Sequence, residues 1–239
     1  MNHASRTLTE AILDPILATD PAGPRITFYD DTTGERVELS ALTLANWAAK
    51  TANLLRDEFA VEPGARVAVL LPAHWQTAAV LLGTWWAGAE VVLEPDADTA
   101  VALVSADRLD EVADVPEVAA LSLDAFGRPV PDLPVGITDY ATSVRVHGDQ
   151  FRPGLAGPAF AGRSVDDVLA AAGASAASRG ISATDRVLSD LAWDSQDALI
   201  DGLLAALASG ASLVQVANAD PSAMDRRIRT EKITRQLTR

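Results

Sequence analysis

One arrangement of residues occurs twice along this chain of 239 residues, and it constrains the fold more than any other feature of the sequence. In the first copy, Arg66–Val67 opens an apolar run, a long apolar segment follows, and Gly88–Ala89 precedes a second apolar run. In the second copy, Arg186–Val187 stands 120 residues further on and Gly210–Ala211 stands 122 residues further on. The order strand, helix, strand is that of a βαβ unit, whose two strands are parallel. We therefore predict an α/β fold with two similar lobes, each with a mainly parallel sheet flanked by helices, and a ligand cleft between the lobes.

Apolar periodicity predicts the remaining elements. Spacings of three and four residues predict helices over 8–20, 41–58 and 73–86, a short helix over 107–112, and an Ala-rich helix from Ser164. Continuous or alternating apolar residues predict strands at Ile26–Tyr29, Arg36–Leu39, Val67–Leu71, Val91–Leu93, Val101–Val104, Val118–Leu123, Thr142–Val146, Val187–Leu191 and Leu213–Val216.

Three regions follow from this pattern. We predict a first α/β lobe over residues 1–125, a connector over 126–163, and a second, smaller α/β lobe with a basic C-terminal tail over 164–239. The connector is identified by its interleaved proline and glycine residues, which are typical of loops.

The chain is acidic, with 33 Asp and Glu against 19 Lys and Arg and a formal net charge of −14. A chain of this charge repels phosphates, so we expect no nucleic-acid partner. The basic residues gather in 222–239, which carries +4 while the rest carries −18. This tail is interpreted as an exposed basic helix folded back on an acidic body.

Several site classes are excluded by composition. The absence of cysteine excludes disulfides, thiol nucleophiles and cysteine-based metal centres. The three histidines show no metal-ligand spacing, and His3 and His147 have no evident partners, so we expect no metal site. The first residues show no secretory signal. Val67–Ala89 carries no charged residue, but Pro72 interrupts it, so we interpret it as strand, turn and buried helix rather than a membrane span, and expect a cytoplasmic protein.

A family resemblance rests on the segment from Trp85 to Pro95, which reads Trp-Trp-Ala-Gly-Ala-Glu-Val-Val-Leu-Glu-Pro and follows Pro63–Val67 and Leu71–Pro72. These motifs, in this order, resemble the N-terminal portion of the adenylate-forming superfamily, which includes the AMP-binding acyl-CoA synthetases, peptide-synthetase adenylation domains and luciferases. The resemblance implies the α/β fold of their N-terminal subdomains. Trp193–Ser195 is similar to the family's Phe-Asp-x-Ser segment, which implies a position at the acyl or amino-acid pocket.

The sequence departs from this family where the phosphates of ATP would bind. Family members have a Thr-, Ser- and Gly-rich loop that ends in Pro-Lys-Gly, whereas Phe151–Arg163 contains no Ser, Thr or Lys and includes two prolines and two phenylalanines. The two lysines of the chain, Lys50 and Lys232, stand in no matching motif. The family's downstream adenine and ribose contacts, metal-binding acid and C-terminal domain with its catalytic Lys have no counterpart. We therefore expect a truncated homologue without a working phosphate loop.

Four residues are candidates for ligand binding, and none is a candidate for catalysis. Trp193 is placed by the resemblance in the cleft, where it would contact a small apolar or acyl ligand. Asp194 and Ser195 either face that ligand or cap the helix that follows, and capping is the favoured interpretation. His74 either lines the cleft or is a solvent-exposed residue at the start of a helix, and exposure is favoured.

Three functions are consistent with these observations. The leading hypothesis is a catalytically silent homologue of acyl-CoA synthetases, a pseudoenzyme that acts as a binding or regulatory protein. The alternatives are the ligand-binding half of a split acyl-activating enzyme that another chain completes, and a structural protein that dimerises. No cofactor is expected, although weak residual binding of AMP, CoA or an acyl ligand is left open. We expect a homodimer or a protein partner that covers an exposed apolar face, and the Ala- and Arg-rich composition suggests a bacterial source.

Overall fold

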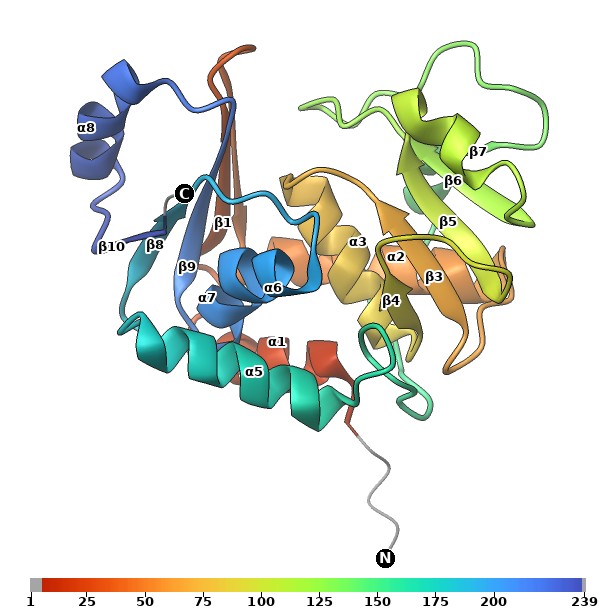
Figure 1. Ribbon diagram of the computed structural model, residues 1–239, viewed down its shortest axis with the longest axis horizontal. Coiled ribbons are helices and arrows are strands. Elements are labelled where there is room, and N and C mark those ends of the chain that lie inside the picture. The colour runs from red at the N-terminus through yellow and green to blue at the C-terminus, as the bar shows by residue number, and fades with distance from the viewer. Residues whose placement is uncertain (1–5, 238–239) are drawn as a thin grey trace, which may run out of the picture. The chain divides into compact units, whose positions relative to one another are not determined.

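A computed structural model describes residues 6–237, in which ten strands form two five-stranded sheets (Figure 1). The described chain divides into two compact units. The first unit contains the described residues up to Glu10, Ala45–Leu71 and Gln76–Val165, and the second contains Ala11–Leu44, Pro72–Trp75 and the described residues from Asp166 onward. The α/β class with two mainly parallel sheets, predicted from the repeated pattern, is confirmed.

The units are discontinuous along the chain, unlike the predicted regions 1–125, 126–163 and 164–239. The N-terminal hairpin joins the second sheet because Ile26 pairs in parallel with Leu213. The predicted connector contributes a strand to the first sheet, where Ala119 pairs with Thr138. Neither pairing has a local signal, since the partners are far apart in sequence.

The first sheet has the order β4-β3-β5-β6-β7, and all its pairings are parallel. Continuous apolar runs are typical of such strands because helices cover both faces of a parallel sheet. Its strands are β3 (Arg66–Leu70), β4 (Glu90–Val92), β5 (Thr99–Ser105), β6 (Glu117–Leu121) and β7 (Thr138–Asp139). The helices along this half of the chain are α1 (Leu8–Thr19), α2 (Ala41–Asp57), α3 (Trp75–Trp86), the 3₁₀ helix η1 (Ala106–Val112) and α4 (Tyr140–Val144).

Helix α4 replaces the strand predicted at Thr142–Val146, so that prediction is wrong. Asp139 caps the helix because its side chain accepts a hydrogen bond from the Thr142 N–H at 2.8 Å. The helix buries Tyr140 and Val144. The N-cap and this burial outweigh the strand preference of the β-branched residues.

The second sheet has the order β10-β8-β9-β1-β2, and only the β1–β2 hairpin is antiparallel within it. Its strands are β1 (Pro24–Asp30), β2 (Glu35–Ser40), β8 (Arg186–Ser189), β9 (Ser212–Ala217) and β10 (Arg235–Leu237). The helices along this part are α5 (Val165–Ser178), α6 (Gln196–Leu199), the π-helical turn η2 (Ile200–Leu204), α7 (Ala205–Ala208) and α8 (Pro221–Thr230).

The crossovers of the second sheet run in opposite directions. The chain passes from β8 through α6 and α7 to β9, and then through α8 back past β8 to β10. Right-handed crossovers in opposite directions place their helices on opposite faces of a sheet. In Figure 1, α8 accordingly lies on one side of these strands and α6 and α7 lie on the other.

The repeated sequence pattern corresponds to two parallel βαβ units, β3-α3-β4 and β8-α6-α7-β9. Both end their helices alike, because Gly88 and Gly210 each have a φ of +80°, which only glycine adopts readily. In each copy, the residue after the glycine donates its N–H to the carbonyl five residues before it. The second copy differs from the first by the π-helical turn.

Of the basic tail, the part up to Thr230 forms helix α8, as predicted, whereas Arg235–Leu237 forms strand β10, so the prediction of a helix is wrong there. Arg227 of α8 is buried and forms an ion pair with Asp31 of the acidic body. Arg239 and His3 lie outside the described residues, as does most of the segment searched for a secretory signal.

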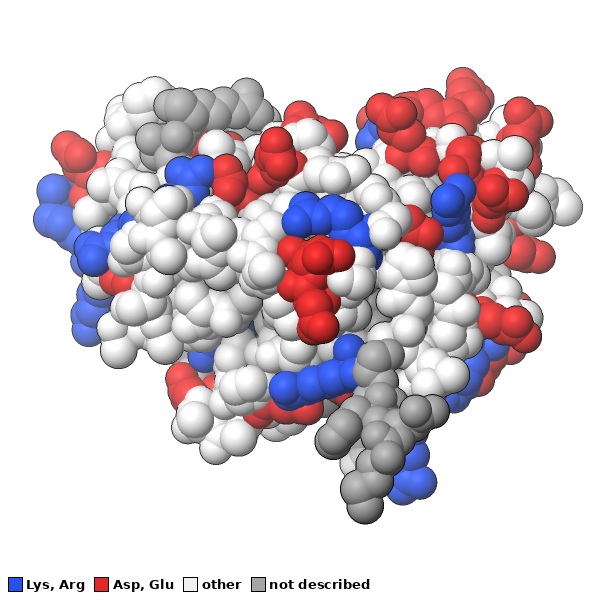
Figure 2. All heavy atoms as spheres, turned by 60° about the horizontal axis from the view of Figure 1, so that its bottom comes forward, with Lys and Arg blue, Asp and Glu red and all other residues white. Residues whose placement is uncertain are grey.

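On the face drawn in Figure 2, basic side chains lie among acidic ones. In the described part of the chain, no helix has the length and apolar character needed to cross a membrane.

Candidate functional site

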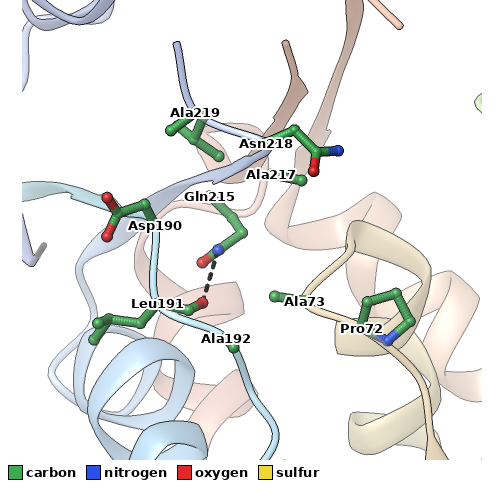
Figure 3. A pocket seen from close by; sticks show the side chains of 10 residues that line it. Pro72, Ala73, Asp190, Leu191, Ala192, Gln215, Ala217, Asn218 and Ala219 are labelled. Atoms are coloured by element: carbon green, nitrogen blue, oxygen red, sulfur yellow. Dashed lines mark hydrogen bonds between the residues drawn. The ribbon is translucent and has the colours of Figure 1, made fainter. Parts of the chain in front are cut away.

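A pocket of about 400 Å³ opens in the second unit, at the carboxyl ends of β8 and β9 (Figure 3). This volume is within the range of small-molecule sites. The residues that line it come from the turn after β3, the loop after β8, and the end of β9 with its following loop: Pro72, Ala73, Asp190, Leu191, Ala192, Gln215, Val216, Ala217, Asn218 and Ala219.

The topology of the second sheet explains why a pocket forms here. The loop after β8 leads to α6 on one face, whereas the loop after β9 leads to α8 on the other face. The two loops therefore diverge and leave a crevice between them. Ligand sites of α/β folds lie at such switch points, outside the carboxyl ends of the strands.

Gln215 is the buried polar residue of the pocket, with 1% of its surface exposed. Its Nε2 donates a hydrogen bond to the Leu191 carbonyl at 3.0 Å. This bond fixes the amide orientation, because a carbonyl only accepts. Figure 3 shows the amide between the loop of Asp190 and Leu191 and the turn at Ala73. Within the described residues, no group donates to Gln215 Oε1.

Asn218 and Asp190 add further acceptors to the pocket lining. Asn218 Nδ2 donates to Asp30 Oδ1 at 2.9 Å, which leaves the Asn218 carbonyl oxygen as an acceptor. Burial raises the pKa of Asp30, but hydrogen bonds from Asn218 and the Thr32 N–H outweigh it and hold that pKa below its usual value. Asp30 is therefore a carboxylate behind the lining, in addition to Asp190 within it. The lining contains no Lys, Arg or His.

Of the sequence candidates, Ser195 caps a helix. Its Oγ accepts the Ala198 N–H at 3.2 Å, and its backbone has the extended conformation of an N-cap residue, with φ −143° and ψ 164°. Asp194 is exposed. The favoured interpretation of this pair as capping residues therefore applies to Ser195. Neither residue lines the pocket.

Trp193 is 3% exposed and packs inside the second unit, against the π-helical turn η2. A Cβ added to Gly202 would lie 3.0 Å from Trp193 Nε1 and 3.3 Å from the Leu191 Cβ. Leu191 lines the pocket and Trp193 does not, and both side chains lie next to Gly202. Within the described residues, its Nε1 has no hydrogen-bond partner.

His74 is buried, with 4% of its surface exposed, so the favoured prediction of a solvent-exposed helix start is wrong. Its ring meets the Phe28 ring edge-on at 4.3 Å between centroids, and its Nε2 lies 3.6 Å from Glu35 Oε1. The β1–β2 hairpin thus covers this histidine. Its neighbours Pro72 and Ala73 line the pocket, whereas His74 does not.

His147 also differs from the prediction, because it has partners. Its Nε2 lies 2.9 Å from Glu58 Oε1 and its Nδ1 lies 4.0 Å from Asp57 Oδ2. Over residues 6–237, no group of three or more His, Asp or Glu residues is arranged to hold a metal ion.

The segment Phe151–Arg163, in which the sequence resemblance implied a missing phosphate loop, is attached to β4. The Val91 N–H donates to the Ala159 carbonyl at 3.0 Å, and the Ala161 N–H donates to the Val91 carbonyl at 3.1 Å. Trp85 Nε1 donates to the same Ala159 carbonyl at 2.7 Å. Phe160 is fully buried, so one of the two phenylalanines of this segment is part of the core.

The backbone donors of the second half of this segment, Gly157–Arg163, are used internally. Every N–H from Gly157 to Arg163 donates to a protein oxygen, and Pro158 has none to donate. The acceptors are the carbonyl oxygens of Gly88, Val91, Phe160 and Arg163 and the carboxylate of Glu90.

The two lysines have structural positions. Lys50 Nζ lies 2.8 Å from Asp149 Oδ1 and donates to the His147 carbonyl at 2.7 Å. Lys232 is exposed and follows α8 with a φ of 54°.

Sequence reasoning missed Gln215, Asn218 and Asp190 as pocket residues. A signal was present for Gln215, because it is the polar residue inside the apolar run Leu213–Val216. A polar side chain at a position of continuous apolar character is buried, and a buried amide needs partners. The other two residues lie in loops and have no such signal.

Comparison with known proteins identifies both a fold and a family. Over 98% of its length the chain superposes on an acyl-CoA synthetase from Brucella canis, with a TM-score of 0.80, 18% identity and 47% of that chain covered. An anthranilate CoA ligase in complex with anthranoyl-AMP gives a TM-score of 0.75 with 14% identity, 97% of this chain and 49% of that chain. A benzoate CoA ligase from Burkholderia xenovorans gives a TM-score of 0.71 with 16% identity. This match covers 94% of this chain and 48% of that chain.

The chain thus spans about half the length of these solved structures. Its fold is that of the N-terminal portion of adenylate-forming enzymes, as the sequence resemblance implied. No family profile matches the chain. A protein of Mycobacterium tuberculosis described as a TIGR03089 family protein is 64% identical over 239 residues, which cover 97% of this chain and 98% of the relative. With this identity over almost its whole length, the chain belongs to the TIGR03089 family.

Proposed function

We propose that the protein is a catalytically silent homologue of acyl-CoA ligases, which binds a small molecule and does not form acyl adenylates. The observation that carries this proposal is the state of Phe151–Arg163, where every N–H from Gly157 to Arg163 already donates within the protein. A phosphate-binding loop requires free N–H groups and a cation that face the phosphates.

Breaking these hydrogen bonds to free the N–H donors would destabilise the protein. Each hydrogen bond contributes about 0.5–1.5 kcal/mol, so a phosphate cradle would require the loss of several such contributions. The burial of Phe160 adds to this, because the side chain would leave the core. The segment has no lysine, and its two arginines, Arg152 and Arg163, stand at or near its ends.

The pocket at the carboxyl ends of β8 and β9 supports a binding role rather than a purely structural one. It is enclosed by three segments of one unit, has the volume of a small-molecule site, and contains a buried amide whose oxygen has no donor among the described residues. A purely structural role does not account for such a group, because an unsatisfied buried acceptor destabilises the fold.

Pyrophosphate exchange with aliphatic and aromatic carboxylic acids tests the proposal. We expect exchange at the level of a control without enzyme, while an active acyl-CoA ligase in the same assay exchanges. Acid-dependent exchange above that control would overturn the proposal. A thermal-shift and calorimetry panel of ATP, AMP, CoA and acyl-CoA, run on the same protein, measures any residual binding of these ligands.

A further inference from the structure

We propose that a second pocket, at the amino ends of β1, β8 and β9, binds a small hydroxylated carboxylate such as a sugar acid. Pro24, Arg186 and Ser212, the first residues of these three strands, line it, and its volume is about 460 Å³. It shares no residue with the pocket at the carboxyl ends of β8 and β9, so the inference goes beyond the proposed function. The second unit alone supplies the lining, which is Asp20, Pro24, Arg25, Ala183, Thr184, Asp185, Arg186, Ser212, Thr230, Glu231 and Lys232.

The first step concerns Arg25, a buried cation of the lining. Its side chain is 6% exposed, and its Nη1 donates to the carbonyl oxygens of Gly210 and Ala211. These bonds fix the guanidinium but bring no negative charge, because a carbonyl is neutral. The carboxylate that faces it, Asp20, is itself 59% exposed. Burial outweighs the attraction of Asp20 and lowers the pKa of Arg25, so the positive charge is incompletely compensated.

The guanidinium of Arg25 has one nitrogen that a ligand reaches. Nε is buried without a partner, and Nη1 is held by the two carbonyl oxygens. Nη2 makes no hydrogen bond within the described residues and, unlike Nε, keeps accessible surface. It lies 3.8 Å from Asp20 Oδ2, which is beyond hydrogen-bond distance, and Asp20 also lines the pocket. A ligand carboxylate next to Nη2 therefore accepts a charge-assisted hydrogen bond.

The second step concerns Lys232, which lines the same pocket from the turn after α8. The side chain is exposed, and within the described residues it has no ion pair and no hydrogen bond. Its ammonium group is therefore available to a ligand. Arg186, the third cation of the lining, is paired with Glu38 and Glu231 instead.

The third step concerns the two other carboxylates of the lining, Asp185 and Glu231, which are paired already. Their partners are Tyr29, Arg36 and Arg186 for Glu231, and Ser182, Thr234 and Arg235 for Asp185. Two cations, Arg25 and Lys232, and one carboxylate, Asp20, are left. These groups favour a ligand with a single negative charge. The acidic remainder of the chain opposes this weakly, because charges more than about 8–10 Å away are largely screened at physiological salt.

The fourth step concerns the body of the ligand. Thr184, Ser212 and Thr230 of the lining carry hydroxyl groups, which both donate and accept hydrogen bonds. Pro24 and Ala183 are its apolar members. Such walls favour hydroxyl groups over an alkyl or aryl group. A small hydroxylated carboxylate therefore matches the cations and the polar walls together.

Two matched series of probes test this inference by calorimetry and ligand-observed NMR, at neutral pH and low ionic strength. The first series is gluconate, glucitol and glucamine, and the second is glycerate, glycerol and aminopropanediol. Each series keeps the hydroxylated body and changes only the charge of the head group. We expect at least one carboxylate to bind, its neutral alcohol to bind about tenfold more weakly, and its amine to bind more weakly still. Butanoate, a carboxylate without hydroxyl groups, should bind more weakly than that carboxylate.

Variants connect the binding to the pocket. Lys232→Gln removes an exposed cation, so we expect the carboxylate to lose about threefold in affinity. Asp20→Asn removes the competing charge and keeps an acceptor for the Gly23 N–H, so the affinity should rise about threefold. Arg25→Gln should abolish the preference for the carboxylate over the alcohol. Arg226→Gln, an exposed change on α8 outside the lining, should leave binding unchanged.

Thermal melting of each variant confirms that it is folded. If Arg25→Gln does not fold, Lys232→Gln and Asp20→Asn decide, because both change exposed side chains. The inference is overturned if no hydroxylated carboxylate binds, if the alcohols or butanoate bind as tightly, or if Lys232→Gln and Asp20→Asn leave the affinity unchanged. These results are separate from a failure of the proposed function, which would be seen as acid-dependent pyrophosphate exchange whatever the probes do.

Discussion

Gly157 and Gly64 are in such close contact that a Cβ added to Gly157 would lie 2.5 Å from both the Gly64 Cα and its backbone nitrogen. The same Cβ would lie 2.8 Å from the Gly88 carbonyl oxygen, which accepts the Gly157 N–H. Backbone atoms cannot move aside as flexible side chains do. These contacts fix Phe151–Arg163 against the backbone at Gly64 and Gly88.

We expect Gly157→Ala to destabilise the protein by about 1–3 kcal/mol, because the added methyl overpacks against backbone on two sides. Gly154→Ala is the matched control in the same segment, since its Cβ would meet only the Pro63 Cγ at an ordinary 3.7 Å. Urea denaturation of both variants measures the difference. Equal stability of the two would contradict the packing described for Gly157.

Glu231 makes the folding stability of the protein depend on pH in the acidic range. Burial raises its pKa, but hydrogen bonds from Tyr29, Arg186 and Arg36 outweigh burial and lower that pKa to about 2 from an unfolded value of 4.5. Because the folded pKa is the lower one, the stabilisation is present above pH 4.5 and is lost as the pH falls toward about 2.

Glu231→Gln should therefore destabilise the protein by about 2 kcal/mol at pH 7, since it removes charge-assisted hydrogen bonds. The difference from the unchanged protein should shrink in denaturation experiments between pH 4.5 and about 2. Asp225→Asn, exposed on the neighbouring helix α8, should show no such pH dependence. A difference that stays constant from pH 7 to pH 2.5 would rule out this role of Glu231.

Ser195→Ala should cost about 1 kcal/mol of stability, because it removes the acceptor for the Ala198 N–H at the start of α6. Asp194→Ala should change stability by less than about 0.5 kcal/mol, since the side chain is exposed and is not the cap. Thermal or urea unfolding of the two single variants decides the matter. The opposite ranking would show that Asp194 is the residue that caps.

Gly202→Ala should destabilise by about 1 kcal/mol, because its methyl would press on the Trp193 ring and on Leu191. The cost should fall when Trp193→Phe is combined with it, since the smaller ring leaves room and removes the unpartnered indole N–H. A double-mutant cycle of the two changes measures this coupling, and additive effects would exclude it.

The dimer or protein partner expected from the sequence stays a prediction. Light scattering at micromolar concentration and affinity capture test it together. A monomer mass combined with the recovery of no binding protein would contradict it.

Local sequence determined which elements form. Continuous apolar runs predicted the buried strands β3, β5 and β9, because strands covered on both faces need no polar positions. Gly88 and Gly210 predicted the ends of two helices, because a positive φ at that position favours glycine. The absence of Ser, Thr and Lys from Phe151–Arg163 predicts that the segment does not bind phosphate, and this stays a prediction.

Tertiary structure alone decided which strands pair, and so what each polar residue meets. The pairing of Ile26 with Leu213 moves the N-terminal hairpin into the second sheet and covers His74, which the sequence placed in solvent. Gln215 is recognisable in the sequence as the polar residue of an otherwise apolar strand. The pocket around it exists only because the loops after β8 and β9 diverge. The physical reason is that periodicity is local, whereas strand order depends on the burial of surfaces contributed by distant parts of the chain.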